Sequence, residues 1–168
     1  MAVNKEIETF KKPLSLGAGI FLQNSKGEVL LGKRTSESGL GLWCLPGGLG
    51  DKIDQNIYDT VIRELEEESG INRVGIIGLI SIDDSEVYTK KCLNFGVWGA
   101  TDQEPQVVDL NEISEWRWFL LDELPADREI FVPSLTTIKS FLQYKIQTNF
   151  MPKGSSDTIQ LGSRGSAG

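Results

Sequence analysis

Three glutamates stand close together in the segment from Gly47 to Ile71. In a helix, spacings of three and four residues place Glu64, Glu67 and Glu68 on one face. Like charges at these spacings cost about 0.2–0.5 kcal/mol per pair in an isolated helix, and only Arg63 is near enough in sequence to offset them. Clustered carboxylate oxygens are the ligands that Mg²⁺ and Mn²⁺ select, which favours a divalent-cation site. A solvated acidic helix face is the alternative interpretation.

A helix over residues 57–69 must position these glutamates. Apolar residues at 57, 58, 61, 62 and 65 form the stripe expected of a helix that packs on a core. Asn56 is a suitable N-cap, and Gly70 is typical of a helix C-terminus. Glu64 and Glu68 border the apolar stripe and do not lie opposite it.

The rest of the chain predicts strands and one more helix. Apolar or alternating runs predict strands over residues 14–23, 28–34, 43–45, 74–82, 91–100 and 115–120. The first two, joined by a turn at 24–27, predict a hairpin. Trp116 and Trp118 alternate along the last strand and are predicted to lie in the core. A closing helix is predicted over 134–147, after Pro133. This order predicts an α/β sandwich of a mixed sheet with flanking helices.

Composition excludes several classes of function. The chain has 168 residues, the usual size of one domain, and a net charge of −7, which disfavours gripping a nucleic-acid backbone. It contains no histidine, so it cannot carry a Ser-His-Asp triad, a Cys-His dyad or a His-ligated zinc. Two cysteines are too few for a disulfide framework, and we expect Cys44 and Cys92 to be buried free thiols.

The ends of the chain are polar. The N-terminus lacks the apolar segment of a secretory signal, and no apolar run approaches the roughly 18 residues that span a bilayer. We therefore expect a soluble, cytoplasmic protein. We expect a flexible N-terminus over residues 1–12, one domain over 13–150, and a disordered Gly/Ser-rich tail over 151–168.

The acidic segment resembles a known family motif. Residues 63–71, R-E-L-E-E-E-S-G-I, match every fixed position in the second half of the Nudix box, R-E-U-x-E-E-x-G-U, where U is apolar. The first half departs from the pattern: eight residues before Arg63 the family has glutamate and this chain has Gln55, whereas counting forward from Gly48 leads to Asp54. The loop is thus one residue longer than usual, and either Asp54 or Gln55 replaces the first glutamate. Flanking segments (LLGKR, WCLPGG, EWRWF and DELP) extend the resemblance over about residues 14–145.

The resemblance implies a fold, a reaction and a cofactor. The fold would be a Nudix-type α/β/α sandwich, and the reaction would be hydrolysis of a nucleoside diphosphate linked to another group, assisted by Mg²⁺ or Mn²⁺. Glu64, Glu67 and Glu68 would be the metal ligands, and Glu64 would also lie nearest the attacking water. Arg63 would pair with a box carboxylate and so hold the loop against the helix.

Further residues are candidates for the base and for substrate binding. Because the chain lacks histidine, a base outside the box must be a carboxylate, with Glu112 the first candidate and Glu104 the second. Two glycines in the box would permit the turn and the close approach of phosphate. Arg34 could reach a phosphate and Trp43 could stack on a base, although an exposed strand-end arginine and a buried strand tryptophan are the alternatives. The two glycines are Gly47 and Gly48.

The substrate class stays broad at this stage. Nucleoside triphosphates, nucleotide sugars such as ADP-ribose, and NADH all fit the resemblance, so we expect a small-molecule nucleotide and neither a nucleic-acid polymer nor a membrane as partner. A homodimer is compatible with the resemblance. The alternative function is a Nudix-fold nucleotide-binding or regulatory module without turnover, suggested by the departure at Gln55.

Overall fold

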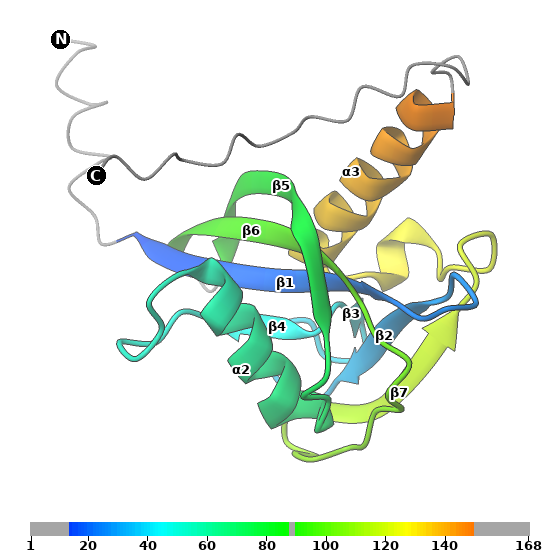
Figure 1. Ribbon diagram of the computed structural model, residues 1–168. Coiled ribbons are helices and arrows are strands. Elements are labelled where there is room, and N and C mark those ends of the chain that lie inside the picture. The colour runs from blue at the N-terminus through cyan, green and yellow to red at the C-terminus, as the bar shows by residue number, and fades with distance from the viewer. Residues whose placement is uncertain (1–13, 88–89, 150–168) are drawn as a thin grey trace, which may run out of the picture.

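The computed structural model describes residues 14–87 and 90–149, so the predictions for residues 1–12 and 151–168 lie outside the described residues. The described residues form a mixed sheet of seven strands with helices on its two faces (Figure 1). The strands are β1 (Ser15–Gln23), β2 (Val29–Arg34), β3 (Trp43–Cys44), β4 (Gly47–Leu49), β5 (Gly75–Val87), β6 (Lys90–Ala100) and β7 (Ile113–Phe119). The helices are α2 (Ile57–Ser69), the short 3-10 helix η1 (Asp127–Glu129) and α3 (Val132–Asn149). The predicted α/β sandwich is confirmed.

The sheet splits beside β1, and this split creates the site described below. The main strand order is β3-β2-β1-β6-β5, and β1 runs parallel to β6 along its whole length. The predicted hairpin of β1 and β2 is paired only at Gln23↔Val29. Beyond that pair, β1 forms antiparallel pairs with β4, and β2 forms antiparallel pairs with β7. Strand β4 was not predicted, because Pro46 and two following glycines are typical of a strand end.

Two apolar cores lie on opposite faces of the sheet. Alternate residues of β1 point to opposite faces, so Ile20 belongs to the core under α2 while Phe21 belongs to the core under α3. The first core is made of Ala18, Ile20, Leu22, Leu30, Val61, Leu65, Ile71 and Val97. The second is made of Phe21, Val29, Leu31, Trp43, Leu45, Ile130, Ile138 and Phe141. Each helix is therefore fixed to the sheet by its own apolar stripe.

Some boundaries differ from the sequence prediction. Helix α3 begins at Val132, so Pro133 lies inside its first turn, where a fixed φ and a missing N–H cause no loss. Trp116 and Trp118 are only half-buried, although both pack against the first core. The indole N–H of each donates a hydrogen bond, to Glu68 O and Glu104 Oε2 respectively. Within the described part of the chain, no helix is long and apolar enough to cross a membrane.

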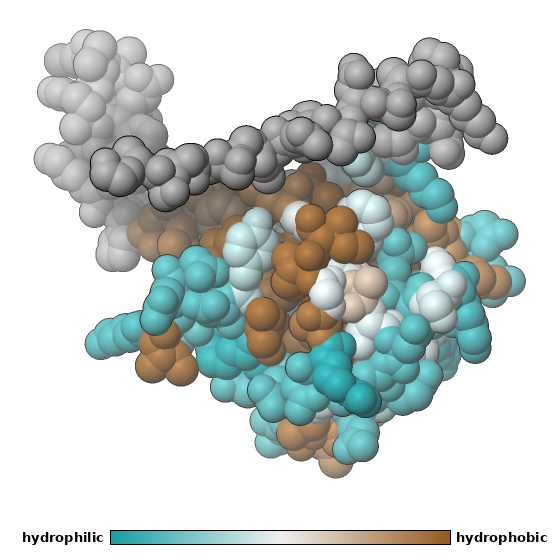
Figure 2. Space-filling view, viewed as in Figure 1, coloured by the Kyte–Doolittle hydropathy of each residue, from teal (hydrophilic) through white to brown (hydrophobic). Residues whose placement is uncertain are grey.

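Strand β5 closes one edge of the sheet and carries apolar side chains that α2 does not cover. Ile77, Leu79 and Ile82 are exposed on this strand. Figure 2 shows an apolar surface on the face that α2 shares with β5, with polar residues below it and to its sides. The site itself lies elsewhere, where the sheet splits.

Candidate active site

Helix α2 begins and ends where the sequence predicts. The Asn56 side chain accepts hydrogen bonds from the backbone N–H groups of Tyr58 and Asp59, and Gly70 closes the helix in the left-handed conformation at φ 68°. The predicted N-cap and C-terminus are confirmed. Val61 and Leu65 of α2 pack in the first core, and Glu64 and Glu68 line the cavity beside it.

Two glycines of β4 receive these glutamates. The backbone N–H of Gly47 donates a 3.0 Å hydrogen bond to Glu68 Oε2. A Cβ at Gly47 would lie 2.2 Å from Ala18 O, and its φ of 146° disfavours any other residue. A Cβ at Gly48 would lie 2.5 Å from Glu64 Cδ. Glycine at 47 therefore lets β4 approach β1 closely, and glycine at 48 leaves room for the Glu64 carboxyl group.

The glutamates open into a cavity of about 620 Å³, a volume typical of small-molecule sites. It lies where β1 leaves β2, and the first turns of α3 form one wall. Its polar lining includes Arg34, Ser36, Glu64, Glu68, Asn94, Glu112, Ser134 and Thr137. Its apolar lining includes Cys44, Leu45, Cys92, Phe95, Ile113, Phe131 and Pro133. Both cysteines are buried free thiols, as predicted.

The cavity lining carries more acidic than basic groups, three glutamates against Arg34. Burial, together with the charges of Glu64 and Glu112, raises the pKa of Glu68 to about 8. Burial also raises the pKa of Glu64, with further contributions from Glu67 and Glu112, although Arg63 acts in the opposite direction. Burial raises the pKa of the Cys44 thiol to about 12, so this group stays protonated. The carboxyl groups thus repel one another in a site that excludes much of the solvent.

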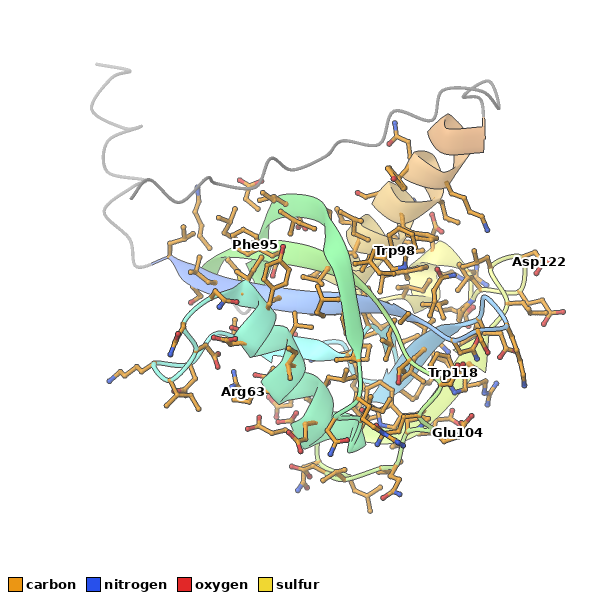
Figure 3. All side chains as sticks on the ribbon, in the orientation of Figure 1. Arg63, Phe95, Trp98, Glu104, Trp118 and Asp122 are labelled. Atoms are coloured by element: carbon orange, nitrogen blue, oxygen red, sulfur yellow. The ribbon has the colours of Figure 1, made fainter. Side chains whose placement is uncertain are left out.

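Arg63 of α2 (Figure 3) is surrounded by acceptors. Its Nε and NH2 groups donate to the two oxygens of Asp54 at 3.0 and 2.9 Å, and NH2 also donates to Leu49 O at 3.0 Å. Its NH1 group donates to Glu64 Oε1 and Glu67 Oε2, both at 2.9 Å. All five N–H groups of the guanidinium are therefore used.

These contacts decide which residue replaces the first glutamate of the box. Asp54 forms the bidentate pair with Arg63, whereas Gln55 is exposed and its backbone N–H donates to Asp59. Thr60 Oγ1 and the Asp51 N–H also donate to Asp54, and these bonds with Arg63 hold the pKa of Asp54 well below its usual range. The extra loop residue brings the shorter aspartate side chain within reach.

The remaining predicted residues divide into two groups. Glu112 and Arg34 line the cavity, and Arg34 lies over the Phe131 ring at 4.3 Å. Glu67 lies outside the cavity, with its side chain 59% exposed and bound to Arg63. Trp43 is only 6% exposed and packs against Phe119 in the second core, which agrees with the buried alternative. Sequence reasoning missed Phe131, which no motif marks.

The second candidate base does not reach the site. Glu104 is bound to Trp118 near β7 and does not line the cavity (Figure 3). The lining residues Asn94 and Ser134 were also missed, because each comes from a regular element without a motif. Ser134 Oγ accepts a 3.0 Å hydrogen bond from the Leu45 N–H and so ties α3 to the cavity wall.

A divalent cation fits this site by the type of donor, although the ligands are not gathered around one point. Among the described residues, no three acidic or cysteine side chains are grouped closely enough to hold one ion. Glu64 and Glu68 nevertheless offer hard oxygen donors in one cavity, with raised pKa values that a cation would reverse.

Comparison with known proteins agrees with this geometry. The family model of the NUDIX domain matches residues 13–137, a range that contains the whole cavity lining. The RNA pyrophosphohydrolase of Gluconacetobacter diazotrophicus is 36% identical over 162 residues, covering 79% of this chain and 93% of that protein. The RNA pyrophosphohydrolase of Novosphingobium aromaticivorans is 27% identical over 135 residues, covering 68% and 81% of the two chains.

A solved structure shows the same fold. The MutT NUDIX hydrolase from Burkholderia pseudomallei is 25% identical, superposes with a TM-score of 0.66, and covers 77% of this chain and 98% of its own. The family match, the relatives and the carboxylate-lined cavity agree. The chain therefore belongs to the Nudix hydrolase family, enzymes that act on phosphoric anhydride bonds.

Proposed function

We propose that this protein is a divalent-metal-dependent pyrophosphohydrolase that cleaves a nucleoside diphosphate linked to another moiety. The observation that carries the proposal is the convergence of Glu64, Glu68 and Glu112 on one cavity that Arg34 also lines. A pyrophosphate is strongly anionic, so this acidic cavity would repel it unless cations intervene.

Mg²⁺ or Mn²⁺ would be held by Glu64, Glu67 and Glu68. Glu64 and Glu68 line the cavity, and Glu67, which contacts Arg63 through Oε2, would be the third ligand. When bound, the ion supplies charge neutralisation of the phosphates and a lower pKa for the attacking water. In its absence the carboxyl groups repel one another, which is the cause of part of their pKa shifts.

The protein groups divide the remaining work. Glu112 is the proposed general base, because it is an exposed carboxylate in the lining of the cavity. Arg34 is fixed by bonds from Nε to Ser38 O and from NH2 to Ser36 Oγ, both 2.8 Å, so it presents an oriented positive charge to a phosphate. Arg63 acts indirectly, by holding the loop through Asp54.

The substrate is proposed to be a small nucleotide. A net charge of −7 disfavours a long contact with an RNA backbone. The two relatives named as RNA pyrophosphohydrolases make a 5′-triphosphate RNA the competing substrate, which would need only its terminal nucleotides in the cavity.

A substrate panel tests the proposal. Nucleoside triphosphates, ADP-ribose, NADH and a 5′-triphosphate RNA oligonucleotide are incubated with the protein and Mg²⁺, and products are identified by mass. We expect cleavage of a phosphoric anhydride in a small nucleotide that stops in EDTA. Cleavage of the RNA alone, or cleavage that persists in EDTA, would overturn the proposal. Tight binding without product would support the nucleotide-binding module instead.

Glu67→Gln tests the assignment of the metal ligands at the most exposed of the three glutamates. We expect kcat to fall by about 100-fold, because a ligand is lost while the shape is kept. Glu66→Gln is the matched control, since Glu66 is an exposed residue of the same helix outside the cavity lining. Full activity of Glu67→Gln at saturating Mg²⁺ would remove Glu67 from the ligand set.

A further inference from the structure

The last turn of α2 carries three consecutive glutamates, at residues 66–68, and no basic residue. The C-terminal end of a helix has a partial negative charge, and its last carbonyl groups have no partner within the helix. Carboxylates are therefore least favourable at this end. The turn depends on hydrogen bonds from outside the helix, and the position of Glu68 depends on them with it.

Two segments distant in sequence supply these bonds. The indole Nε1 of Trp116, on β7, donates to Glu68 O at 3.3 Å. The Gln106 N–H and Gln103 Nε2 donate to the next two carbonyl oxygens, at 2.8 and 3.0 Å. Three successive carbonyl groups thus have donors outside the helix. Figure 1 shows the C-terminal end of α2 beside β7.

The second tryptophan of β7 supports the same turn through the loop. Trp116 and Trp118 are alternate residues of the strand, and both pack against the first core. Trp118 Nε1 donates at 3.1 Å to Glu104 Oε2, in the loop that carries Gln103 and Gln106 (Figure 3). Trp116 thus bonds directly to the helix, and Trp118 bonds to the loop that closes it.

Glu68 is held at both its backbone and its carboxyl group. Its backbone oxygen accepts from Trp116, and its Oε2 accepts from the Gly47 N–H at 3.0 Å. The indole in turn lies directly against β2, because a Cβ at Gly32 would be 2.7 Å from Trp116 Cζ3. The position of the Glu68 carboxyl group in the cavity therefore depends on where the indole lies.

We propose that Trp116 is a positioning residue of the metal site, whose indole N–H holds the last turn of α2 and so places Glu68 in the cavity. This inference rests on the proposed function for the role of Glu68 as a metal ligand. Groups that orient a ligand affect the affinity for the metal, whereas a tryptophan that only fills the core affects stability alone.

Trp98 of β6 offers a matched control. It is also half-buried and packs against the second core, but within the described part of the chain its indole N–H has no hydrogen-bond partner. Trp116→Phe and Trp98→Phe each replace an indole by a phenyl ring. Only the first of these substitutions removes a hydrogen bond.

The test measures the metal alone. Binding of Mn²⁺ to the full chain is measured by calorimetry without nucleotide, and the melting temperature is measured beside it. We expect the Kd for Mn²⁺ to rise about fivefold in Trp116→Phe, the worth of one hydrogen bond, and to stay unchanged in Trp98→Phe, while both variants melt at lower temperature. A wild-type Mn²⁺ affinity in Trp116→Phe, or equal losses in the two variants, would overturn the inference.

Gly32→Ala keeps the test decisive if Trp116→Phe does not fold. The new methyl group would displace the indole while the N–H is retained, so we expect weaker Mn²⁺ binding. Gly78→Ala on β5 is its control, because a Cβ there would meet nothing within 4 Å. Equal Mn²⁺ affinities of Gly32→Ala and Gly78→Ala would overturn the inference.

The outcome separates this inference from the proposed function. Weaker Mn²⁺ binding in Trp116→Phe, without hydrolysis of any nucleotide by the wild type, would support the role of Trp116 and reject the proposed hydrolysis. Hydrolysis by a wild type whose Mn²⁺ affinity does not depend on Trp116 would do the reverse. A wild type that binds no Mn²⁺ would overturn both.

Discussion

Asp54 and Glu68 are two carboxylates at opposite ends of one segment with opposite electrostatics. Asp54 is half-buried, and its pKa is lowered, mainly by its hydrogen bond with Arg63. Glu68 is buried, and burial raises its pKa to about 8. Glu68 accepts from one backbone N–H, and the neighbouring charges of Glu64 and Glu112 act against that of Arg34. Burial and the balance of neighbouring charges thus decide the sign of each shift.

This difference separates a structural charge from a functional one. The charge of Asp54 is neutralised within the chain, and the bonds of Asp54 hold the loop before α2. The charge of Glu68 has no such compensation, which a protein tolerates chiefly where a ligand supplies it. Arg63 thus compensates the charge of Asp54, as the proposed cation would compensate that of Glu68.

The comparison is tested most severely by Glu68→Gln. Glutamine keeps the shape and can still accept from the Gly47 N–H, but it loses the charge. We expect kcat to fall by about 100-fold or more, while the melting temperature of the metal-free protein at pH 8 rises, because a repelled charge is removed. Activity assays and calorimetry measure the two effects. A lower melting temperature together with retained activity would assign Glu68 a structural role.

Asp54→Ala tests the second carboxylate of the comparison. It leaves the Nε of Arg63 and one NH2 hydrogen without acceptors, so the loop loses its main attachment. We expect about a tenfold loss of kcat/KM, since the loop positions β4 indirectly, and a lower melting temperature. Gln55→Ala is the control, because Gln55 contributes only its backbone N–H. Equal effects of the two variants would remove the distinction between these neighbouring residues.

The two carboxylates also predict opposite dependences of stability on pH. A raised pKa in the folded state means that the stability linked to Glu68 is complete below about pH 4.5 and is lost as the pH rises to about 8. The lowered pKa of Asp54 means that its stabilisation is complete above its ordinary value and is lost in acid. We therefore expect the melting temperature in EDTA to fall by several degrees between pH 5 and 8. Glu68→Gln should flatten that fall, and an unchanged slope would contradict the assignment.

The sequence predicted the helix and its carboxylates better than the walls around them. Periodicity, Asn56 and Gly70 are local signals, and they located α2 to the residue. Strand β4 was missed because its glycines look like a break, and only pairing with β1 makes Gly47–Leu49 a strand. Phe131 and Asn94 were missed for a related reason: they meet at the cavity through β1, β6 and α3, which are distant in sequence.

The choice between Asp54 and Gln55 shows where sequence reasoning ends. Counting from Gly48 and counting from Arg63 give different answers, since the loop has one extra residue. Only the folded loop, in which Asp54 N–H donates to Asp51 O and Thr60 reaches Asp54, selects one of them.

Gln55→Glu should have the smallest effect, although it restores the spacing of the family motif. A new carboxylate would need a free donor on Arg63, and all five N–H groups of that side chain already have acceptors. It would also stand near Asp59, whose carboxylate accepts from the Gln55 N–H. We expect kcat/KM and the melting temperature to stay within about twofold and a few degrees of wild type, because exposed ion pairs contribute little. Higher activity, with loss of the sensitivity to Asp54→Ala in the double variant, would show that Arg63 exchanges partners and that Asp54 is replaceable.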